Sequence, residues 1–408
     1  MISIDGLDPS KISEIDLGGR QLKDNARQVL YQWATNPPFY VLNNGPPQVI
    51  VGRYADVHEV FTDPSRFSSR VPRGKGYEQF DRFLGQQFVT QMDGEQHARV
   101  RRLLMAAFTP KRLAQLEGRM IEIINGLLDD IERSGPEFDA MNQYGAQLVV
   151  GVLLTAMMNL DNDQRTAVLR FQEVQHLMTA TKPGHSFPQE AIDAHRRMSD
   201  VIQSLIDERR MTVKSDFLAD LVAARDQGDR LTDQELFDTI FGTAGALATL
   251  PRSSSGAILE LYTHHAQLQQ LMDSPSLIPQ AVEECLRLAS NGYFTFPRVA
   301  TCDTEVGGTL IRKGMIVRPS PQAANYDPTV FDDPLRFDIH RNPKRIISFG
   351  AGPHHCIGHV LGRMTLQTAI RLLISRFPMA RLRNPDFKPF YTGATGELRM
   401  RELPMLTH

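Results

Sequence analysis

The chain has 408 residues, of which 41% are hydrophobic, and this is enough apolar material for one large core or several smaller ones. It carries 45 Lys and Arg residues against 47 Asp and Glu residues. The formal net charge of −2 gives the chain no overall attraction to nucleic acid or to an anionic membrane. No linker or break in composition divides the sequence, so we expect residues 1–408 to form a single domain.

Cysteine usage and hydropathy indicate the compartment. The three cysteines, Cys285, Cys302 and Cys356, have unrelated spacings that form no disulfide framework, which suits a reducing cytoplasm. Residues 1–25 lack the basic start and apolar core of a signal peptide. The longest apolar run, 148–158, is too short to span a bilayer and is typical of a buried helix. We therefore expect a cytoplasmic protein without a membrane anchor.

The N-terminal part of the chain predicts a small β region followed by helices. Two short strands around an Asn-Asn-Gly turn, a helix and a long loop are expected, in this order, at residues 37–41, 48–52, 54–60 and 70–91. A helix then begins near Asp93 with acidic residues in its first turn, as the helix dipole prefers. His97 and Arg101 are four residues apart in it and therefore share one helical face.

Helices fill the middle of the chain. They are expected at residues 113–131, 143–158, 163–179, 189–209 and 216–225. The next helix begins at Thr232, which forms with Glu235 the sequence pattern of a capping box, and it continues to Pro251. Small residues dominate 242–248, which would let a bulky ligand approach the backbone. Because proline lacks an amide hydrogen, Pro251 predicts a bend beside Leu247.

The C-terminal part of the chain combines a charged pair with strands. Glu284 and Arg287 lie three residues apart on one helical face, a pair that alone stabilises a helix by about 0.2–0.5 kcal/mol. Residues 294–298 predict a strand, and residues 306–317 predict a hairpin.

A glycine-rich stretch, Ser348–Gly358, holds Cys356 directly before a helical stretch at 359–371. Gly350 and Gly352 can adopt backbone angles closed to other residues, so a flat ligand can lie against the main chain. The partial positive charge at the helix N-terminus favours a thiolate at Cys356. A thiolate held in this way is either a nucleophile or a soft metal ligand.

Two other interpretations of Cys356 compete with these. A lone cysteine is often a buried core thiol. Zinc is the second, because His354, His355 and His359 lie close by, although structural zinc usually needs four well-spaced ligands.

The stretch from Phe349 to Gly358 resembles the haem-binding signature of the cytochrome P450 family, Phe-Gly-x-Gly-x-His/Arg-x-Cys-x-Gly, at every fixed position. The helix with His97 and Arg101 resembles another family motif, with Gly94 and Glu95 in place of two prolines. Further motifs follow in family order, so the resemblance covers the chain from about Pro37 to its end. It implies a mainly α fold with a smaller β region, and the lack of an apolar N-terminal helix suits the soluble bacterial members.

The resemblance also implies roles for individual residues. Cys356 would be the axial ligand of haem b, from which position a thiolate favours O–O cleavage. The other cofactor contacts would be His97, Arg101, Arg298 and His354 at the propionates, and Phe349, Gly350 and Gly358 in the loop. Glu284, Arg287 and Arg336 would form a structural cluster. Substrate contacts are expected at Phe83, Phe88, Phe241, Ala244, Gly245, Leu247, Thr295, Phe296 and Tyr391.

The helix that crosses the oxygen side of the haem departs from the family pattern. In the register set from the downstream segment, Thr249 occupies the position of the alcohol that serves oxygen activation, and Ala248 stands where the family has an acid. If Ala244-Gly245 is instead aligned with the family's Ala-Gly, Leu247 and Ala248 occupy the acid and alcohol positions, so neither register supplies a carboxylate. Oxygen cleavage needs two protons, and alanine cannot relay one. We therefore expect proton delivery assisted by substrate or water, or a reaction that depends less on the relay.

The resemblance implies a monooxygenase that hydroxylates or dealkylates a small to medium apolar organic molecule. The chain lacks a nucleotide-binding Gly motif and an iron–sulfur Cys set, so electrons must come from another protein. The resemblance implies that this donor is a ferredoxin with its reductase. We expect a monomer that binds neither nucleic acid nor membrane. A basic cluster could steer the acidic donor, although a solvated face explains it nearly as well: Arg99, Arg102, Lys111, Arg112, Lys344, Arg345 and Arg363.

Three alternatives stay open at this stage. The first is an oxidative-coupling or peroxide-using haem-thiolate enzyme. The second is a nitric-oxide reductase type, since Ala-Thr in place of acid-Thr resembles that branch of the family. The third is a haem sensor without catalytic activity.

Overall fold

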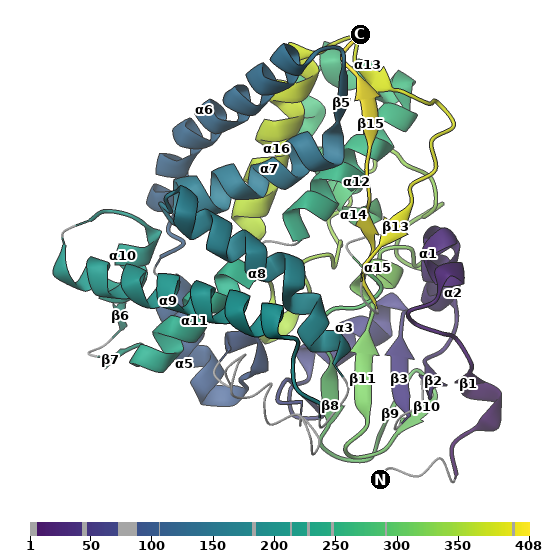
Figure 1. Ribbon diagram of the computed structural model, residues 1–408. Coiled ribbons are helices and arrows are strands. Elements are labelled where there is room, and N and C mark those ends of the chain that lie inside the picture. The colour runs from purple at the N-terminus through teal and green to yellow at the C-terminus, as the bar shows by residue number, and fades with distance from the viewer. Residues whose placement is uncertain are drawn as a thin grey trace. The chain divides into compact units, whose positions relative to one another are not determined.

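The computed structural model describes residues 6–42, 47–71, 88–105, 107–181, 185–212, 214–226, 229–245, 249–289, 292–393 and 396–408 (Figure 1). Helices predominate and strands form a smaller part, which confirms the expected fold class. The chain forms two compact units. The first comprises Met1–Val71, Asn125–Ala146 and Leu250–His408, and the second Pro72–Ile124 and Gln147–Thr249.

The main sheet of the described residues belongs to the first unit and has the strand order β1-β2-β3-β11-β8-β4. These strands are β1 (Ile12–Ser13), β2 (Phe39–Val41), β3 (Gln48–Val51), β4 (Phe67–Ser68), β8 (Arg298–Ala300) and β11 (Ile316–Pro319). The predicted N-terminal strand pair is confirmed as the antiparallel ladder of β2 and β3. β11 pairs in parallel with β3 and antiparallel with β8, so segments about 250 residues apart in the chain contribute to one sheet.

Short antiparallel ladders also occur in the first unit. They join β9 (Thr304–Val306) to β10 (Thr309–Ile311), β13 (Tyr391–Thr392) to β14 (Arg399–Met400), and β15 (Pro404–Leu406) to both β12 (Arg381–Leu382) and β5 (Glu137–Asp139). The hairpin expected at 306–317 is confirmed in part. Residues 304–311 form it, but Ile316 and Val317 leave it and pair in the main sheet instead.

The first unit also contains helices, several of which are labelled in Figure 1. They are α1 (Arg20–Asp24), α2 (Ala26–Thr35), α3 (Tyr54–Thr62), α12 (Thr249–Thr263, in this unit from Leu250), α13 (His265–Asp273), α14 (Ile278–Leu288), α15 (Pro321–Ala324) and α16 (His359–Arg376). Single 3-10 turns occur at η1 (Pro9–Lys11), η6 (Pro275–Leu277) and η7 (Gly352–His354). The predicted helices at 54–60 and 359–371 are confirmed as α3 and α16.

Helix α3 packs its apolar face on the main sheet. Val57, Val60 and Phe61 belong to one buried cluster with Val49 of β3 and Val317 of β11. Each such side chain contributes about 1.5–3 kcal/mol when it is fully buried. The sheet therefore fixes the position of α3, which in turn contacts the cysteine loop described below.

The second unit is largely helical. Its elements are η2 (Val89–Gln91), α5 (Gly94–Met105), α6 (Pro110–Ser134, in this unit to Ile124), α8 (Asn162–Ala180), α9 (Gln189–Met211), α10 (Phe217–Ala223), β6 (Arg225–Asp226), β7 (Asp229–Arg230) and α11 (Asp233–Gly245). Helix α9 packs against both α8 and α11 (Figure 1). The capping box at the start of α11 is confirmed, because Glu235 N–H donates to Thr232 Oγ1 at 3.1 Å and Thr232 N–H donates to Glu235 Oε2 at 2.9 Å.

The predicted α-helix at 143–158 has a different hydrogen-bond register. The structure has π-helices at η3 (Ala140–Gly145) and η4 (Val149–Met157) around a short α7 (Ala146–Leu148). Within η4 the Thr155 hydroxyl donates to the carbonyl of Val150, five residues back, at 2.9 Å. Apolar periodicity places a helix here, but it does not distinguish these registers.

Two further expectations differ from the structure. The strand expected at 294–298 begins only at Arg298, because Pro297 has no amide hydrogen for a ladder and Phe294 instead stacks on Trp33 with ring centroids 5.3 Å apart. The helix expected from Thr232 to Pro251 is described as α11 and α12. Residues 246–248, and with them the bend expected beside Leu247, lie outside the described residues.

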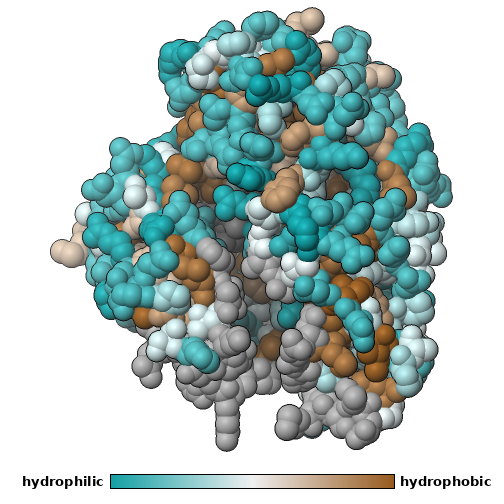
Figure 2. All heavy atoms as spheres, turned by 45° about the vertical axis from the view of Figure 1, so that its right-hand side comes forward, coloured by the Kyte–Doolittle hydropathy of each residue, from teal (hydrophilic) through white to brown (hydrophobic). Residues whose placement is uncertain are grey.

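The surface is mostly polar on the face shown in Figure 2, where hydrophobic side chains gather in separate patches. Among the described residues, no helix combines the length and the apolar character that crossing a membrane requires.

Gly52 and Gly126 provide a matched test of this packing. A Cβ at Gly52 would lie 2.3 Å from the carbonyl oxygen of Trp33, so Gly52→Ala should destabilise the protein by roughly 1–3 kcal/mol. A Cβ at Gly126, inside α6, would meet no atom within 4 Å, so Gly126→Ala should stabilise the protein by about 0.5–1 kcal/mol. Urea unfolding followed by circular dichroism measures both changes. Equal effects of the two variants would contradict this account.

Candidate haem-binding site

The cysteine loop, residues 348–358, leads directly into α16. Cys356 N–H donates to the carbonyl of Phe349 at 2.9 Å, and Gly350 N–H donates to that of Ile347 at 2.8 Å. Gly350 and Gly352 have φ angles of +71° and +66°, in the left-handed region that disfavours side chains. Cys356 is exposed and lies two residues before the helix N-cap, Gly358. The loop thus presents a sulfur atom at the positive end of a helix dipole.

Neighbouring elements of the first unit hold this loop. A Cβ at Gly352 would lie 2.5 Å from the carbonyl oxygen of Phe61, so only glycine allows the loop to lie this close to α3. Asn325 accepts from Ile347 N–H at 2.9 Å and donates to Ser348 Oγ at 2.7 Å. Ser348 donates in turn to the carbonyl of Leu286 at 2.7 Å. The loop is therefore tied to both α3 and α14.

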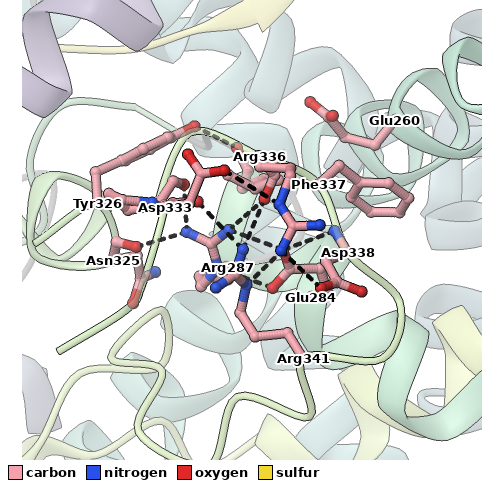
Figure 3. A network of polar contacts seen from close by, with 12 residues as sticks. Glu260, Glu284, Arg287, Asn325, Tyr326, Asp333, Arg336, Phe337, Asp338 and Arg341 are labelled. Carbon is pink, nitrogen blue, oxygen red and sulfur yellow. Dashed lines mark hydrogen bonds and ion pairs between the residues drawn. The ribbon is translucent and has the colours of Figure 1, made fainter. Parts of the chain in front are cut away.

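Glu284 and Arg287 of α14 form a fully buried ion pair (Figure 3). Arg287 Nε and Nη2 each lie 2.8 Å from a different oxygen of Glu284. Arg287 Nη1 donates to the carbonyls of Asn325 at 2.9 Å and Pro334 at 2.7 Å. The pair thus contacts Asn325, whose side chain forms hydrogen bonds with Ile347 and Ser348 at the start of the cysteine loop. This supports the structural role expected of Glu284 and Arg287.

Arg336 joins this network differently from our expectation. Its guanidinium was expected to complete the cluster, but it is 61% exposed and pairs with Asp333 at 3.1 Å and Asp338 at 3.2 Å. Its carbonyl oxygen accepts from Arg287 at 3.2 Å. The second guanidinium on Glu284 is that of Arg341, with Nε at 3.1 Å from Oε1 (Figure 3). Arg341 was not among the residues expected in this cluster, since no local spacing relates it to Glu284.

The remaining predicted residues of the first unit lie in varied surroundings. Arg298 is buried, donates to the carbonyls of Phe296 and Pro297 at 3.2 Å, and places its Cζ 5.7 Å from the centroid of the Phe61 ring. His354 Nε2 lies 2.9 Å from Ser69 Oγ.

Three expected substrate contacts also belong to the first unit. Thr295 is half-buried, whereas Phe296 is 57% exposed. Tyr391 is half-buried, and its burial raises the pKa of the phenol.

The other predicted residues belong to the second unit. His97 is buried on α5, and Arg101 follows it one turn later. Phe88 and Phe241 have ring centroids 6.2 Å apart, and Phe241 also packs against Phe171 of α8 at 5.3 Å. Thr249 is the exposed first residue of α12.

Ala244 reveals a contact that the sequence did not indicate. Its carbonyl accepts a hydrogen bond from Gln172 of α8 at 2.5 Å. Gly245 ends α11. Phe83, Leu247 and Ala248 lie outside the described residues.

The residues of the first unit fit a haem with thiolate ligation. Cys356 offers an exposed sulfur, while Arg298 and His354 are cationic or polar groups suited to carboxylates. A Cβ at Gly358 would lie 4.0 Å from Cys356 Sγ, so a larger residue there would fill the space beside the sulfur. Among the described residues no group of three or more His, Cys, Asp or Glu side chains is arranged to hold a metal ion, so the zinc alternative has no support in that part of the chain.

The fold and this loop define the class of protein as a haem-thiolate oxidoreductase. The family model described as Cytochrome P450 matches residues 20–273 and 264–405. The mycinamicin IV hydroxylase/epoxidase of Micromonospora griseorubida is 36% identical over 346 residues, which cover 83% of this chain and 84% of that relative. The nocardicin C N-oxygenase of Nocardia uniformis subsp. tsuyamanensis is 35% identical over 344 residues, covering 82% of this chain and 83% of the relative.

A solved structure agrees with this match. The bacillaene polyketide synthase cytochrome P450 PksS of Bacillus subtilis 168 has a TM-score of 0.86 at 27% identity, over 96% of this chain and 99% of that one. The chain belongs to the cytochrome P450 family, and the expected fold is confirmed. As a P450 monooxygenase it belongs to the oxidoreductases that act on paired donors and incorporate molecular oxygen. Haem, redox partners and organic substrates are properties of this family.

The buried pair allows a test within one network. Arg287→Met should destabilise the protein by roughly 3–5 kcal/mol, because it leaves the carboxylate of Glu284 buried with less compensation. Arg336→Gln should change stability by no more than about 0.5 kcal/mol, because that side chain is exposed. Unfolding in urea measures both. If Arg287→Met does not fold, Arg341→Gln should still give a loss larger than that of Arg336→Gln. A larger loss of stability in Arg336→Gln than in Arg341→Gln would contradict the assignment of Arg341 as the second guanidinium on Glu284.

Proposed function

We propose that this protein hydroxylates or dealkylates a small to medium apolar organic molecule, with haem b as cofactor and a separate ferredoxin as electron donor. The observation that carries the proposal is the exposed sulfur of Cys356 in a left-handed glycine loop at the start of α16. When bound, the haem supplies the reduction and cleavage of dioxygen, which a thiolate ligand favours. Residues 1–408 act as one functional domain.

The side chains of the site bind and orient the cofactor. Cys356 would supply the sulfur ligand of the haem iron, and the backbone of Phe349, Gly350 and Gly358 would keep this sulfur in place. Cationic and polar side chains would bind the haem propionates. The residues proposed for this task are His97, Arg101, Arg298 and His354. The burial of Arg298 supports this role, because a buried guanidinium favours an anionic partner.

Aromatic and small residues bind the substrate. Phe88 and Phe241 lie in an aromatic group of the second unit that suits an apolar molecule. The two relatives, named as a hydroxylase/epoxidase and an N-oxygenase, support oxygen insertion into an organic compound. The further proposed contacts are Phe83, Ala244, Gly245, Leu247, Thr295, Phe296 and Tyr391.

Proton delivery relies on Thr249 together with substrate or water, because Ala248 has no group that carries a proton. The same alanine favours a second candidate function. A haem-thiolate enzyme that uses peroxide, couples phenols or reduces nitric oxide depends less on such a relay. Turnover with peroxide alone, or oxidation of reduced nicotinamide by nitric oxide without a donor protein, identifies these reactions. A haem sensor would show no turnover with any donor.

The surroundings of the protein follow from its composition. We place it in the cytoplasm, since its cysteines form no disulfide pattern. We also propose that it acts as a monomer. A ferredoxin reductase supplies the ferredoxin with electrons.

The haem ligand is tested by exchange of the sulfur. Cys356→Ser should lose the red-shifted Soret band that the carbon monoxide complex of a reduced haem thiolate shows, and it should lose turnover. Cys302→Ser is the control, because Cys302 is also exposed but lies outside the loop. Absorption spectra of both variants after reduction under carbon monoxide decide the point. Normal pigment and full turnover in Cys356→Ser would disprove the proposal.

Proton delivery is tested at position 248. Ala248→Asp should raise the yield of product per reduced nicotinamide severalfold, because the new carboxylate can relay protons. Ala248→Asn, which has a similar shape but does not titrate, should leave the yield near that of the wild type. The measurement compares product with nicotinamide consumed, for substrates with and without a polar group. Tight coupling in the wild type regardless of substrate polarity would contradict substrate assistance.

A further inference from the structure

Arg363 of α16 and Glu283 of α14 form an ion pair beside the cysteine loop. Arg363 Nε and Nη2 lie 2.6 Å and 3.0 Å from the two oxygens of Glu283. Arg363 Nη1 lies 3.0 Å from His359 Nδ1. The side chains of Arg363 and Glu283 are 26% and 20% exposed. Arg363 is therefore held by neighbours in its own unit. From the sequence, we had instead placed it in a basic cluster that could steer an acidic electron donor.

The guanidinium of Arg363 also lies on the ring of Phe349. Its Cζ is 4.4 Å from the ring centroid, a cation–π distance. His359 packs edge-on against the same ring with centroids 6.2 Å apart. Two side chains from the N-terminal part of α16 thus hold the ring of Phe349.

Phe349 connects this pair to the ligand. Its carbonyl oxygen accepts the hydrogen bond from Cys356 N–H at 2.9 Å. Phe349 thus contacts both the guanidinium of Arg363, through its ring, and Cys356, through its carbonyl oxygen. Outer residues of this kind adjust the electron density of a metal ligand and thereby its reduction potential.

We propose that the charges of Arg363 and Glu283, held beside Phe349 and the cysteine loop, tune the reduction potential of the haem. The inference rests on the proposed function, because it requires Cys356 to ligate the iron. The step concerned is the uptake of one electron by ferric haem from the donor protein to give ferrous haem, without a proton or a bond to the chain. The positive charge of Arg363 favours the more negative, ferrous state, and the carboxylate of Glu283 limits this effect.

The two charges have opposite effects, and this separates tuning from a merely structural role. Loss of the guanidinium in Arg363→Gln should lower the equilibrium constant for reduction roughly three- to tenfold, which for one electron corresponds to a potential about 30–59 mV lower. Loss of the carboxylate in Glu283→Gln should raise the potential by a similar amount. The double variant should lie between the two single variants. Arg363→Lys keeps the charge and should stay close to the wild type.

The experiment is a spectroscopic redox titration of the holoenzyme, with dithionite as reductant and mediator dyes. The control is Arg371→Gln, an exposed arginine on the same helix, which should leave the potential unchanged. If Arg363→Gln does not retain haem, the rise in Glu283→Gln and the wild-type value in Arg363→Lys still test the proposal. Shifts of the same sign in Arg363→Gln and Glu283→Gln, or no shift in Glu283→Gln, would overturn it.

The spectrum under carbon monoxide distinguishes failure of this inference from failure of the proposed function. A wild type without the thiolate band would refute ligation by Cys356 and the inference with it. A wild type with the band, whose potential does not respond to the two charges in opposite directions, would refute the inference alone.

Discussion

The geometry of the cysteine loop depends on one interaction, the buried ion pair between Glu284 and Arg287. Removing two charges from water costs several kcal/mol per ion, so the pair adds little to stability by itself. The pair matters because both side chains also form hydrogen bonds with other segments of the chain. The guanidinium of Arg287 binds carbonyls of Asn325 and Pro334, and Glu284 also accepts from Asp338 N–H at 3.1 Å. One buried centre therefore connects α14 to the segment that precedes the cysteine loop.

The loop receives its second support from glycine. Gly352 lies against the carbonyl of Phe61, which the hydrophobic cluster of α3 and the main sheet holds in place. The third support is the packing of Phe349 on the first turn of α16. Backbone contacts and packing from three directions thus orient Cys356, as its proposed role as haem ligand requires.

Local patterns in the sequence predicted the features that depend on few neighbouring residues. The glycine and cysteine spacing of the loop and the Thr232–Glu235 capping box are of this kind, because the residues that form them are close in the chain. Arg341 could not be found in this way, since its contact with Glu284 spans 57 residues. Similarly, the apolar spacing of 143–158 predicted a helix, but the π register depends on contacts such as that of Thr155 with Val150.

The hydrogen bond from Gln172 to the carbonyl of Ala244 has a consequence for how this chain tolerates change. The last carbonyls of a helix have no partner within that helix. Here an amide from α8 serves the carbonyl of Ala244, next to the residue that ends α11. Changes in the sequence of one helix therefore affect the other. An insertion or a one-residue shift in α8 would move Gln172 away and remove the donor to the carbonyl of Ala244. Such a change in α8 would leave the carbonyl of Ala244 at the end of α11 without this hydrogen bond, although no residue of α11 is substituted.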